Sequence, residues 1–266
     1  MDKKHDAFQL ESFPATREGA IDLLREAQRK HMIHGLMEVD VTVPRSYLRQ
    51  HKARTGETLS FTAFVVKCLA QAVDEDKQLH AYRRGKRQLV VFDEVDVNTM
   101  VEREIAGQRM GTPNIIRAAN KKAFQQIHEE IRAAQATQVE QVPGMEWFRW
   151  APLLSHLPTA LRAMLWHRLA RNPQAIKRFA GTVGVTAVGM FGKGGGWGLT
   201  IPFLTLNLVL GGISEKPVLV SGHVEAREHL CITVSVDHDV VDGAQAARFS
   251  ARLRDLIEHS FGLAEG

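Results

Sequence analysis

One short stretch, SVDHDVVDGAQAARF at residues 235–249, carries the sharpest chemical signal in this sequence. An apolar, β-type run ends at His238, and a helix is predicted to begin at about Gly243. An imidazole at the end of a strand can project from a rigid edge into a cleft, where it can remove a proton and return it. Asp242 can cap the helix or hold a nearby cation, which would fix the turn. The spacing alone also fits a surface turn with a capping aspartate and an incidental histidine.

The second candidate is the glycine-rich stretch GTVGVTAVGMFGKGGGWG at residues 181–198. Thr186 is predicted near the end of a strand, where its hydroxyl could donate a hydrogen bond to an oxyanion. The glycines that follow let a ligand approach the backbone, or they form a flexible hairpin loop. The pattern does not predict a phosphate-binding P-loop, because Lys193 is followed by Gly194 and G-x-x-x-x-G-K-[ST] is not completed.

Metal chemistry is not expected. The 12 histidines are scattered along the chain, and none forms an H-E-x-x-H motif or a compact group with carboxylates. The two cysteines, Cys68 and Cys231, lie inside apolar runs, as buried thiols of a reducing compartment do. Their number excludes a disulfide scaffold and a cysteine-ligated metal site.

Composition indicates a folded protein. Of the 266 residues, 44% are hydrophobic and 24% are charged, so the chain can bury a sizeable core. The net charge of +4 only weakly suggests an anionic partner, and no nucleic-acid-binding module is present. The sequence shows neither a signal peptide nor an uncharged apolar run of about 18 residues, so we expect a cytoplasmic protein.

Hydrophobic periodicity predicts the elements that position these candidates. Helices are expected at 16–31, 45–54, 60–75, 121–135 and 243–260. Strands are expected at 34–43, 88–92, 94–102, 182–188, 203–210, 216–226 and 228–237. The stretch 107–120 has two glycines and a proline and is predicted to be loop with short extended structure. This order indicates an α/β or α+β layer structure.

The order of motifs resembles a known family. DHDVVDGA (237–244) is similar to the H-x-x-x-D-G signature shared by chloramphenicol acetyltransferase and the catalytic domains of 2-oxoacid dehydrogenase acyltransferases, whose usual form is DHRxxDGA. Further similar segments follow in family order from about residue 17 to residue 260: MEVDVT (37–42), SFTAFVVKCLAQAV (60–73), VNTMVERE (97–104), IIRAANKKAFQQIHEEI (115–131), TVGVTAVGMFG (182–192) and LNLVLGGI (206–213).

The resemblance implies an α/β sandwich with a chloramphenicol acetyltransferase-like mixed sheet flanked by helices. It also implies a homotrimer, or an assembly of trimers, with the active site in a channel between subunits. Residues 16–262 would form a single catalytic domain after a tail at 1–15. Coenzyme A would enter the channel from one side and the second substrate from the other.

By position in the family motifs, His238 would be the general base and Thr186 would stabilise the tetrahedral oxyanion. Asp242 would orient the site through an arginine, for which Arg17 is the candidate. The resemblance requires no metal or redox cofactor, and it does not identify the residues that bind coenzyme A.

The chain departs from the family pattern in three respects. Asp239 replaces the arginine after the histidine, and an acid there could weaken the base by favouring a protonated imidazole. Thr186–Ala187 replaces a Ser-Asn pair, which keeps the hydroxyl and loses the amide. About 15 residues precede the catalytic domain, too few for a lipoyl domain, so a lipoyl group would be supplied by a separate protein.

The interpretation is therefore a coenzyme A-dependent acyltransferase. It would move an acyl group between acyl-CoA and a dihydrolipoyl-type thiol or another small acceptor. The alternative is a catalytically silent oligomeric scaffold of the same fold, which Asp239 and the missing domains favour.

An insertion at about 140–180 has no counterpart in the family pattern. Its core, residues 147–180, has three tryptophans and six Lys or Arg residues but no acidic residue, which predicts a basic amphipathic helical segment. It could be a helical hairpin packed on the core, a lid over the acyl or acceptor channel, or a basic face toward a membrane surface or the phosphates of coenzyme A. Our hypothesis is a lid that alters acceptor choice. Unchanged folding, activity and substrate range after deletion of 145–178 would refute it.

Overall fold

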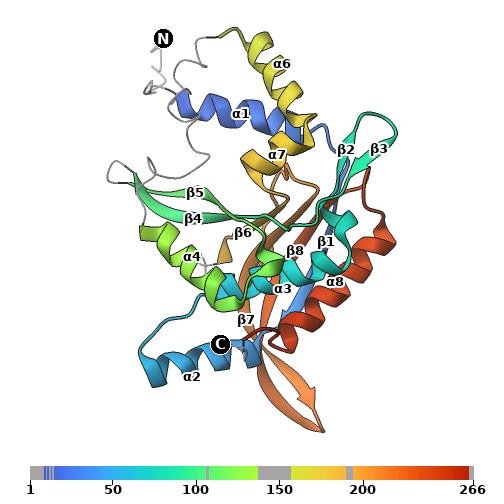
Figure 1. The fold of residues 1–266 in the computed structure, drawn as a ribbon. Helices are drawn as coiled ribbons and strands as arrows, with labels where there is room; N and C mark the ends of the chain where they lie inside the picture. The colour runs from blue at the N-terminus through green and yellow to red at the C-terminus, as the bar shows by residue number, and fades with distance from the viewer. Residues whose placement is uncertain are drawn as a thin grey trace, which may run out of the picture.

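The computed structural model describes residues 15–105, 108–136, 157–189 and 194–263, together with residues 9, 11 and 13. Its centre is a six-stranded sheet in the order β1-β8-β7-β6-β4-β5 (Figure 1). The bounds are β1 (Met32–Asp40), β4 (Val97–Ile105), β5 (Gln108–Ile116), β6 (Val183–Ala187), β7 (Leu206–Val220) and β8 (His223–Asp237). Strand β6 runs parallel to both of its neighbours and every other pair is antiparallel, so the sheet is mixed. The predicted fold class is confirmed.

Helices cover one face of this sheet. Helices α3 (Phe61–Glu75), α4 (Phe124–Ala136) and α8 (Gly243–Glu258) pack against it, and α2 (Thr42–Thr55) lies near its lower end in Figure 1. Helix α3 is the most deeply buried, because every residue from 63 to 70 is buried. The Ser60 hydroxyl caps it by accepting the Ala63 N–H (3.2 Å).

The strand register separates the two faces of the sheet. Val185, Leu208 and Val234 lie side by side on β6, β7 and β8 and belong to the core under the helices. Because side chains alternate along a strand, Thr186 and its neighbour Val209 face the other way. Thr186 therefore lies on the sheet face away from α3 and α8.

The prediction of loop with only short extended structure at 107–120 is wrong for residues 108–116. Residues 108–116 form β5, which pairs antiparallel with the whole of β4. Pro113, opposite Met100, cannot donate a ladder hydrogen bond, but β5 is an edge strand and needs partners on one side only. Gly111 and Pro113, which suggested a loop, therefore lie in a strand at the sheet edge.

The prediction of one strand at 216–226 is also wrong. Strand β7 ends at Val220, and β8 begins at His223. The two residues between them, Ser221 (φ 49°) and Gly222 (φ 84°), both have positive φ, which is the geometry of a tight two-residue hairpin turn. The Ser-Gly dipeptide was the available sequence signal.

Part of the insertion lies outside the described residues, namely 137–156 with Trp147 and Trp150. The described part is helical, as predicted: α6 (Thr159–Ala170) and α7 (Pro173–Ala180). These helices lie beside α1 (Ala15–Ala27) and the small β2–β3 hairpin (Tyr82–Arg84 and Gln88–Val90) in Figure 1. Within the described ranges, no helix is long and apolar enough to cross a bilayer.

Candidate active site

The turn that carries His238, residues 237–242, joins the end of β8 to the start of α8. The His238 N–H donates to the His31 carbonyl (2.9 Å), and the N–H groups of Val240 and Val241 both donate to the Asp237 carbonyl (3.0 Å each). The side chains of Val240 and Val241 are buried beneath the turn. The His238 side chain is exposed, so a fixed turn presents its imidazole to solvent at the end of the sheet.

Asp237 anchors this turn, and the sequence reasoning gave it no role. Its backbone N–H donates to the Thr205 carbonyl (2.9 Å). Its buried carboxylate accepts hydrogen bonds from Lys30 Nζ (2.8 Å) and from the Asp239 N–H (3.2 Å). The Lys30 ammonium also lies 5.7 Å from the centroid of the Tyr82 ring. An acid as the last residue of an apolar strand was the available signal, because a buried carboxylate requires a partner.

The Asp239 carboxylate is bound on the side of α1 and β2. It accepts hydrogen bonds from His31 Nδ1 (3.0 Å) and Arg83 Nη1 (2.8 Å). The hydrogen bond from His31, followed by the Arg83 guanidinium, lowers the pKa of Asp239. The acid that replaces the family arginine is therefore balanced by Arg83.

Asp242 is the N-cap of α8, where its carboxylate accepts the Gln245 N–H (2.7 Å). The predicted ion pair with Arg17 is wrong for the single chain: within the described ranges no ion pair joins them, and Arg17 is exposed on α1. Helix α1 directs its acids, Glu18 and Asp22, toward the insertion instead. Asp242 thus fixes the start of α8 through its cap.

Thr186 lies near the end of β6, and its side chain is half-buried. Just beyond it the backbone runs very close to β7: a Cβ built on Gly189 would be 1.8 Å from the Gly211 carbonyl oxygen. Only a residue without a side chain fits there. Residues 190–193, with Lys193, lie outside the described residues.

Thr186 and His238 are far apart within one chain. Val183 on β6 and Val236 on β8 both pair with Leu206 of the intervening strand β7. Thr186 lies three residues beyond Val183 along β6. His238 lies two residues beyond Val236 in the opposite direction. These steps correspond to about 17 Å along the strands and about 10 Å across them. One protomer therefore cannot bring this hydroxyl and this imidazole to the same carbonyl group.

Buried His80 ties the start of β6 to the β2–β3 region. Its Nε2–H donates to the Phe92 carbonyl (3.0 Å), and its Nδ1 accepts from the Thr182 hydroxyl (2.9 Å). Burial is the main cause that lowers the pKa of His80 to about 4. The neutral ring is thus part of the fold beside the strand that carries Thr186.

Two hollows lie near these elements. A cavity of about 100 Å³ lies beside the His238 turn, and its lining includes Lys30, Asp237 and two residues of the inserted helices, Ala170 and Ile176. The insertion therefore forms part of the wall next to the turn.

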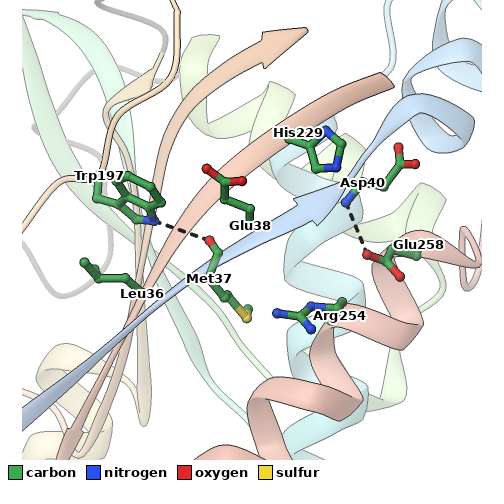
Figure 2. A pocket seen from close by; sticks show the side chains of 8 residues that line it. All are labelled: Leu36, Met37, Glu38, Asp40, Trp197, His229, Arg254 and Glu258. Carbon is green, nitrogen blue, oxygen red and sulfur yellow. Dashed lines mark hydrogen bonds between the residues drawn. The ribbon is translucent and has the colours of Figure 1, made fainter. Parts of the chain in front are cut away.

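Figure 2 shows the second hollow, of about 450 Å³, along β1. Two hydrogen bonds join residues of its lining: Trp197 Nε1 donates to the Met37 carbonyl (3.3 Å), and Glu258 accepts the Asp40 N–H (3.2 Å). Neither His238 nor Thr186 lines it. In the part of the chain that the structure describes, no three His, Cys, Asp or Glu side chains converge as a metal site.

Comparison with known proteins gives a family match. The family model of the 2-oxoacid dehydrogenases acyltransferase (catalytic domain) matches residues 8–141 and 172–264. A relative in Bacillus subtilis, the lipoamide acyltransferase component of the branched-chain alpha-keto acid dehydrogenase complex, is 24% identical over 228 residues, 84% of this chain and 46% of its own. The chain thus spans less than half the length of that relative.

Solved structures share the fold. The cubic core of the pyruvate dehydrogenase multienzyme complex matches with a TM-score of 0.67 at 19% identity, over 94% of this chain and 92% of the other. Azotobacter vinelandii dihydrolipoamide acetyltransferase, studied for the catalytic roles of a serine, a histidine and an asparagine, matches with a TM-score of 0.68 at 18% identity and the same coverage. Chloramphenicol acetyltransferase matches at 14% identity with a TM-score of 0.50, over 94% of this chain and 98% of the other.

Proposed function

The chain belongs to the 2-oxoacid dehydrogenase acyltransferase family, and on that premise we propose that it transfers an acyl group between acyl-CoA and a thiol acceptor. The observation that carries the proposal is the exposed imidazole of His238 on a turn fixed by the rest of the fold. The donor is coenzyme A-bound, and the acceptor is a dihydrolipoyl-type thiol on a separate protein or another small acceptor. Residues 16–262 are proposed as one catalytic domain, acting in the cytoplasm without a metal.

His238 acts as the general base. It takes the proton from the attacking thiol, and the thiolate sulfur adds to the thioester carbonyl to give a tetrahedral oxyanion. The carbon–sulfur bond to the departing thiol then breaks, the carbonyl re-forms, and the imidazolium returns the proton to the leaving sulfur. Exchange between two thioesters is close to balanced, so positioning, proton transfer and oxyanion stabilisation are sufficient.

Thr186 of a neighbouring copy donates the hydrogen bond to the oxyanion. This assignment is supported by the distance of about 20 Å between Thr186 and His238 in one chain, obtained from the strand register. It is also supported by the Azotobacter vinelandii enzyme: its serine, histidine and asparagine have the same separations along the chain as Thr186, His238 and Asp242. In this chain a carboxylate takes the place of the asparagine.

Two of the three acids around the base are positioning residues. Asp237 fixes the turn through Lys30, and Asp242 fixes the start of α8. Asp239, which favoured the silent-scaffold alternative, is neutralised by Arg83 and bound by His31. These partners of Asp239 support the enzyme over the silent scaffold.

A trimer, or an assembly of trimers, would complete the site. The β7–β8 hairpin extends beyond the helices at the bottom of Figure 1. Leu219 and Val224 face each other across the two strands near the tip, and each side chain is 72% exposed. This exposure is expected if the tip makes an apolar contact with a neighbouring copy. Light scattering on the purified chain, with Leu219→Glu as the variant, tests the assembly.

The insertion is proposed to act as a lid that alters acceptor choice, because Ala170 and Ile176 line the cavity beside Asp237. Replacing Ile176 by Ala and Ala170 by Leu should shift the relative rates for free dihydrolipoamide and for other small acceptors. Equal acceptor and donor profiles in both variants and in the wild type would contradict the lid.

The activity is tested with acyl-CoA and free dihydrolipoamide, monitored by the release of coenzyme A. We expect His238→Ala to lower kcat by about 10³-fold and Thr186→Ala by about 10²-fold, with Thr186→Ser largely active. A wild-type chain that neither binds nor turns over any acyl-CoA would favour the silent scaffold.

Mixing the two inactive variants tests whether neighbouring copies share a site. If His238→Ala and Thr186→Ala chains are unfolded together and refolded at equal amounts, about a quarter of the interfaces in a cyclic oligomer combine two intact residues. Activity should rise to that fraction of the wild-type value. If the refolded mixture is no more active than the separate variants, the shared site is contradicted. His238 and Thr186 would then act within the same chain, or one of them would have no catalytic role.

A further inference from the structure

The outward face of α6 carries an apolar stripe. Leu161, Met164 and Leu165 are exposed by 39%, 53% and 45%, and no residue of this helix is buried. Their spacing of three and four residues places them on one side of the helix. Helix α6 thus presents its apolar side to solvent in the single chain.

Two cations continue this stripe. Arg168 and Arg171 are exposed and follow Leu165 toward the end of α6. Neither forms an ion pair with a carboxylate in the ranges that the structure describes, and α6 itself contains no Asp or Glu. The outer face of the helix is therefore apolar at its start and positive at its end.

Charged contacts with α1 hold the inner face of α6. Arg162 pairs with Glu18 (2.5 Å) and Asp22 (2.9 Å) of α1, and His167 contacts Glu26 (3.2 Å). These contacts use the acids of α1 on the side opposite the apolar stripe. Helix α6 also lies in the gap, 142–171, between the two stretches that the family model matches. The acyltransferase fold therefore does not require the stripe.

We propose that α6 is an interfacial helix that binds this protein to anionic membrane surfaces. Leu161, Met164 and Leu165 would enter the boundary of the acyl chains, and Arg168 and Arg171 would bind lipid headgroup phosphates. This role is independent of acyl transfer and describes a protein that lies on a bilayer without crossing it.

The size of the stripe favours a lipid surface over a protein partner. A stable protein interface involves about 20–30 residues on each side, whereas the described part of this face offers four side chains of α6 and its C-cap Arg171. A bilayer requires no matching shape, and its negative charge fits the two arginines. Several copies in one oligomer would add their weak contacts on the same surface.

Vesicle sedimentation with the full chain tests the proposal. The probes are vesicles of phosphatidylcholine alone and vesicles with equal amounts of phosphatidylcholine and phosphatidylglycerol. We expect binding to the anionic vesicles, little binding to the neutral ones, and weakening by salt. Met164→Glu with Leu165→Glu should abolish binding, and each of Arg168→Gln and Arg171→Gln should weaken partition about five-fold.

Leu165→Glu alone should also weaken binding, and Leu89→Glu is its matched control, because Leu89 on β3 is 42% exposed against 45% for Leu165 and each variant adds one negative charge. It should bind like the wild type. Equal loss in Leu89→Glu and in the α6 variants, or no binding of the wild type to anionic vesicles, would overturn the proposal. A change in oligomeric state in the α6 variants, with vesicle binding intact, would show instead that a second copy covers the stripe. The arginine variants keep the test decisive if the double glutamate variant does not fold.

Discussion

The two halves of the candidate site are held by different means. The His238 turn is fixed by side chains and backbone groups from distant elements. One of these groups is the Lys30 ammonium, which binds the buried carboxylate of Asp237 at the start of the turn. The end of β6 that carries Thr186 is fixed by close backbone packing, with Gly189 against Gly211. The first half is complete within one chain, whereas the second presents its hydroxyl on the sheet face away from the helices. Substitutions should therefore damage the two halves in distinguishable ways.

The most damaging single change in the β6 half should be Gly189→Ala. The new methyl group would lie 1.8 Å from the Gly211 carbonyl oxygen, so the backbone must move. We expect about 3 kcal/mol of destabilisation, measured by urea unfolding, together with loss of kcat as Thr186 is displaced. Gly35→Ala is the control, because a Cβ there meets nothing within 4 Å. Equal stability of the two variants would show that the close packing of β6 on β7 does not matter.

Acid should weaken the same half through His80. The pKa of His80 is lowered to about 4 by burial, below about 6.5 in the unfolded chain, so the unfolded chain takes up the proton first as the pH falls. The neutral His80 ring therefore makes its full contribution to the free energy of unfolding above about pH 6.5. This contribution is lost as the pH falls toward 4. We expect a loss of about 2 kcal/mol between pH 7.5 and pH 5, measured by urea unfolding. In His80→Gln this part of the pH dependence should disappear, and an unchanged dependence would contradict the assignment.

In the other half, Lys30→Met should leave the buried Asp237 carboxylate without its cation. Lys30 Nζ lies 2.8 Å from Asp237 Oδ2, and the side chains of Lys30 and Asp237 are 21% and 8% exposed. Because Lys30 is partly solvated, we expect about 2 kcal/mol of destabilisation and a lower kcat with little change in KM. Lys121→Met, which breaks the exposed pair with Glu94, should change stability by less than about 0.5 kcal/mol. Similar losses in both lysine variants would deny Asp237 its role as the anchor.

The smallest effect is expected from Asp239→Asn. Its carboxylate is partly exposed, and its partners Arg83 and His31 are more exposed still. We expect a change in stability within about 0.5 kcal/mol and activity within about three-fold of the wild type. A large gain in activity at neutral pH would show that the negative charge of Asp239 does restrain the base.

Much of the fold could be predicted from the sequence where a local pattern and a tertiary role agree. Helix α3 combines an apolar run with a capping Ser60, so both its identity and its start were predictable. Strand β5 was missed because Gly111 and Pro113 have the composition of a loop, and only its place at the sheet edge makes the proline tolerable. The hairpin at Ser221–Gly222 was missed because apolar alternation continues on both sides of the turn.

The sequence by itself determined the candidate groups of the site, because their signals are local: His238 ends an apolar strand, Asp242 opens a helix and Thr186 precedes a run of glycines. Only the tertiary structure decided what each group contacts. Asp239 meets His31 and Arg83 from remote parts of the chain, Arg17 does not reach Asp242, and the strand register separates Thr186 from His238. The physical reason is that periodicity and caps act over a few residues. Side-chain pairing and the distance between strand ends depend on which strands become neighbours, and no local pattern states that.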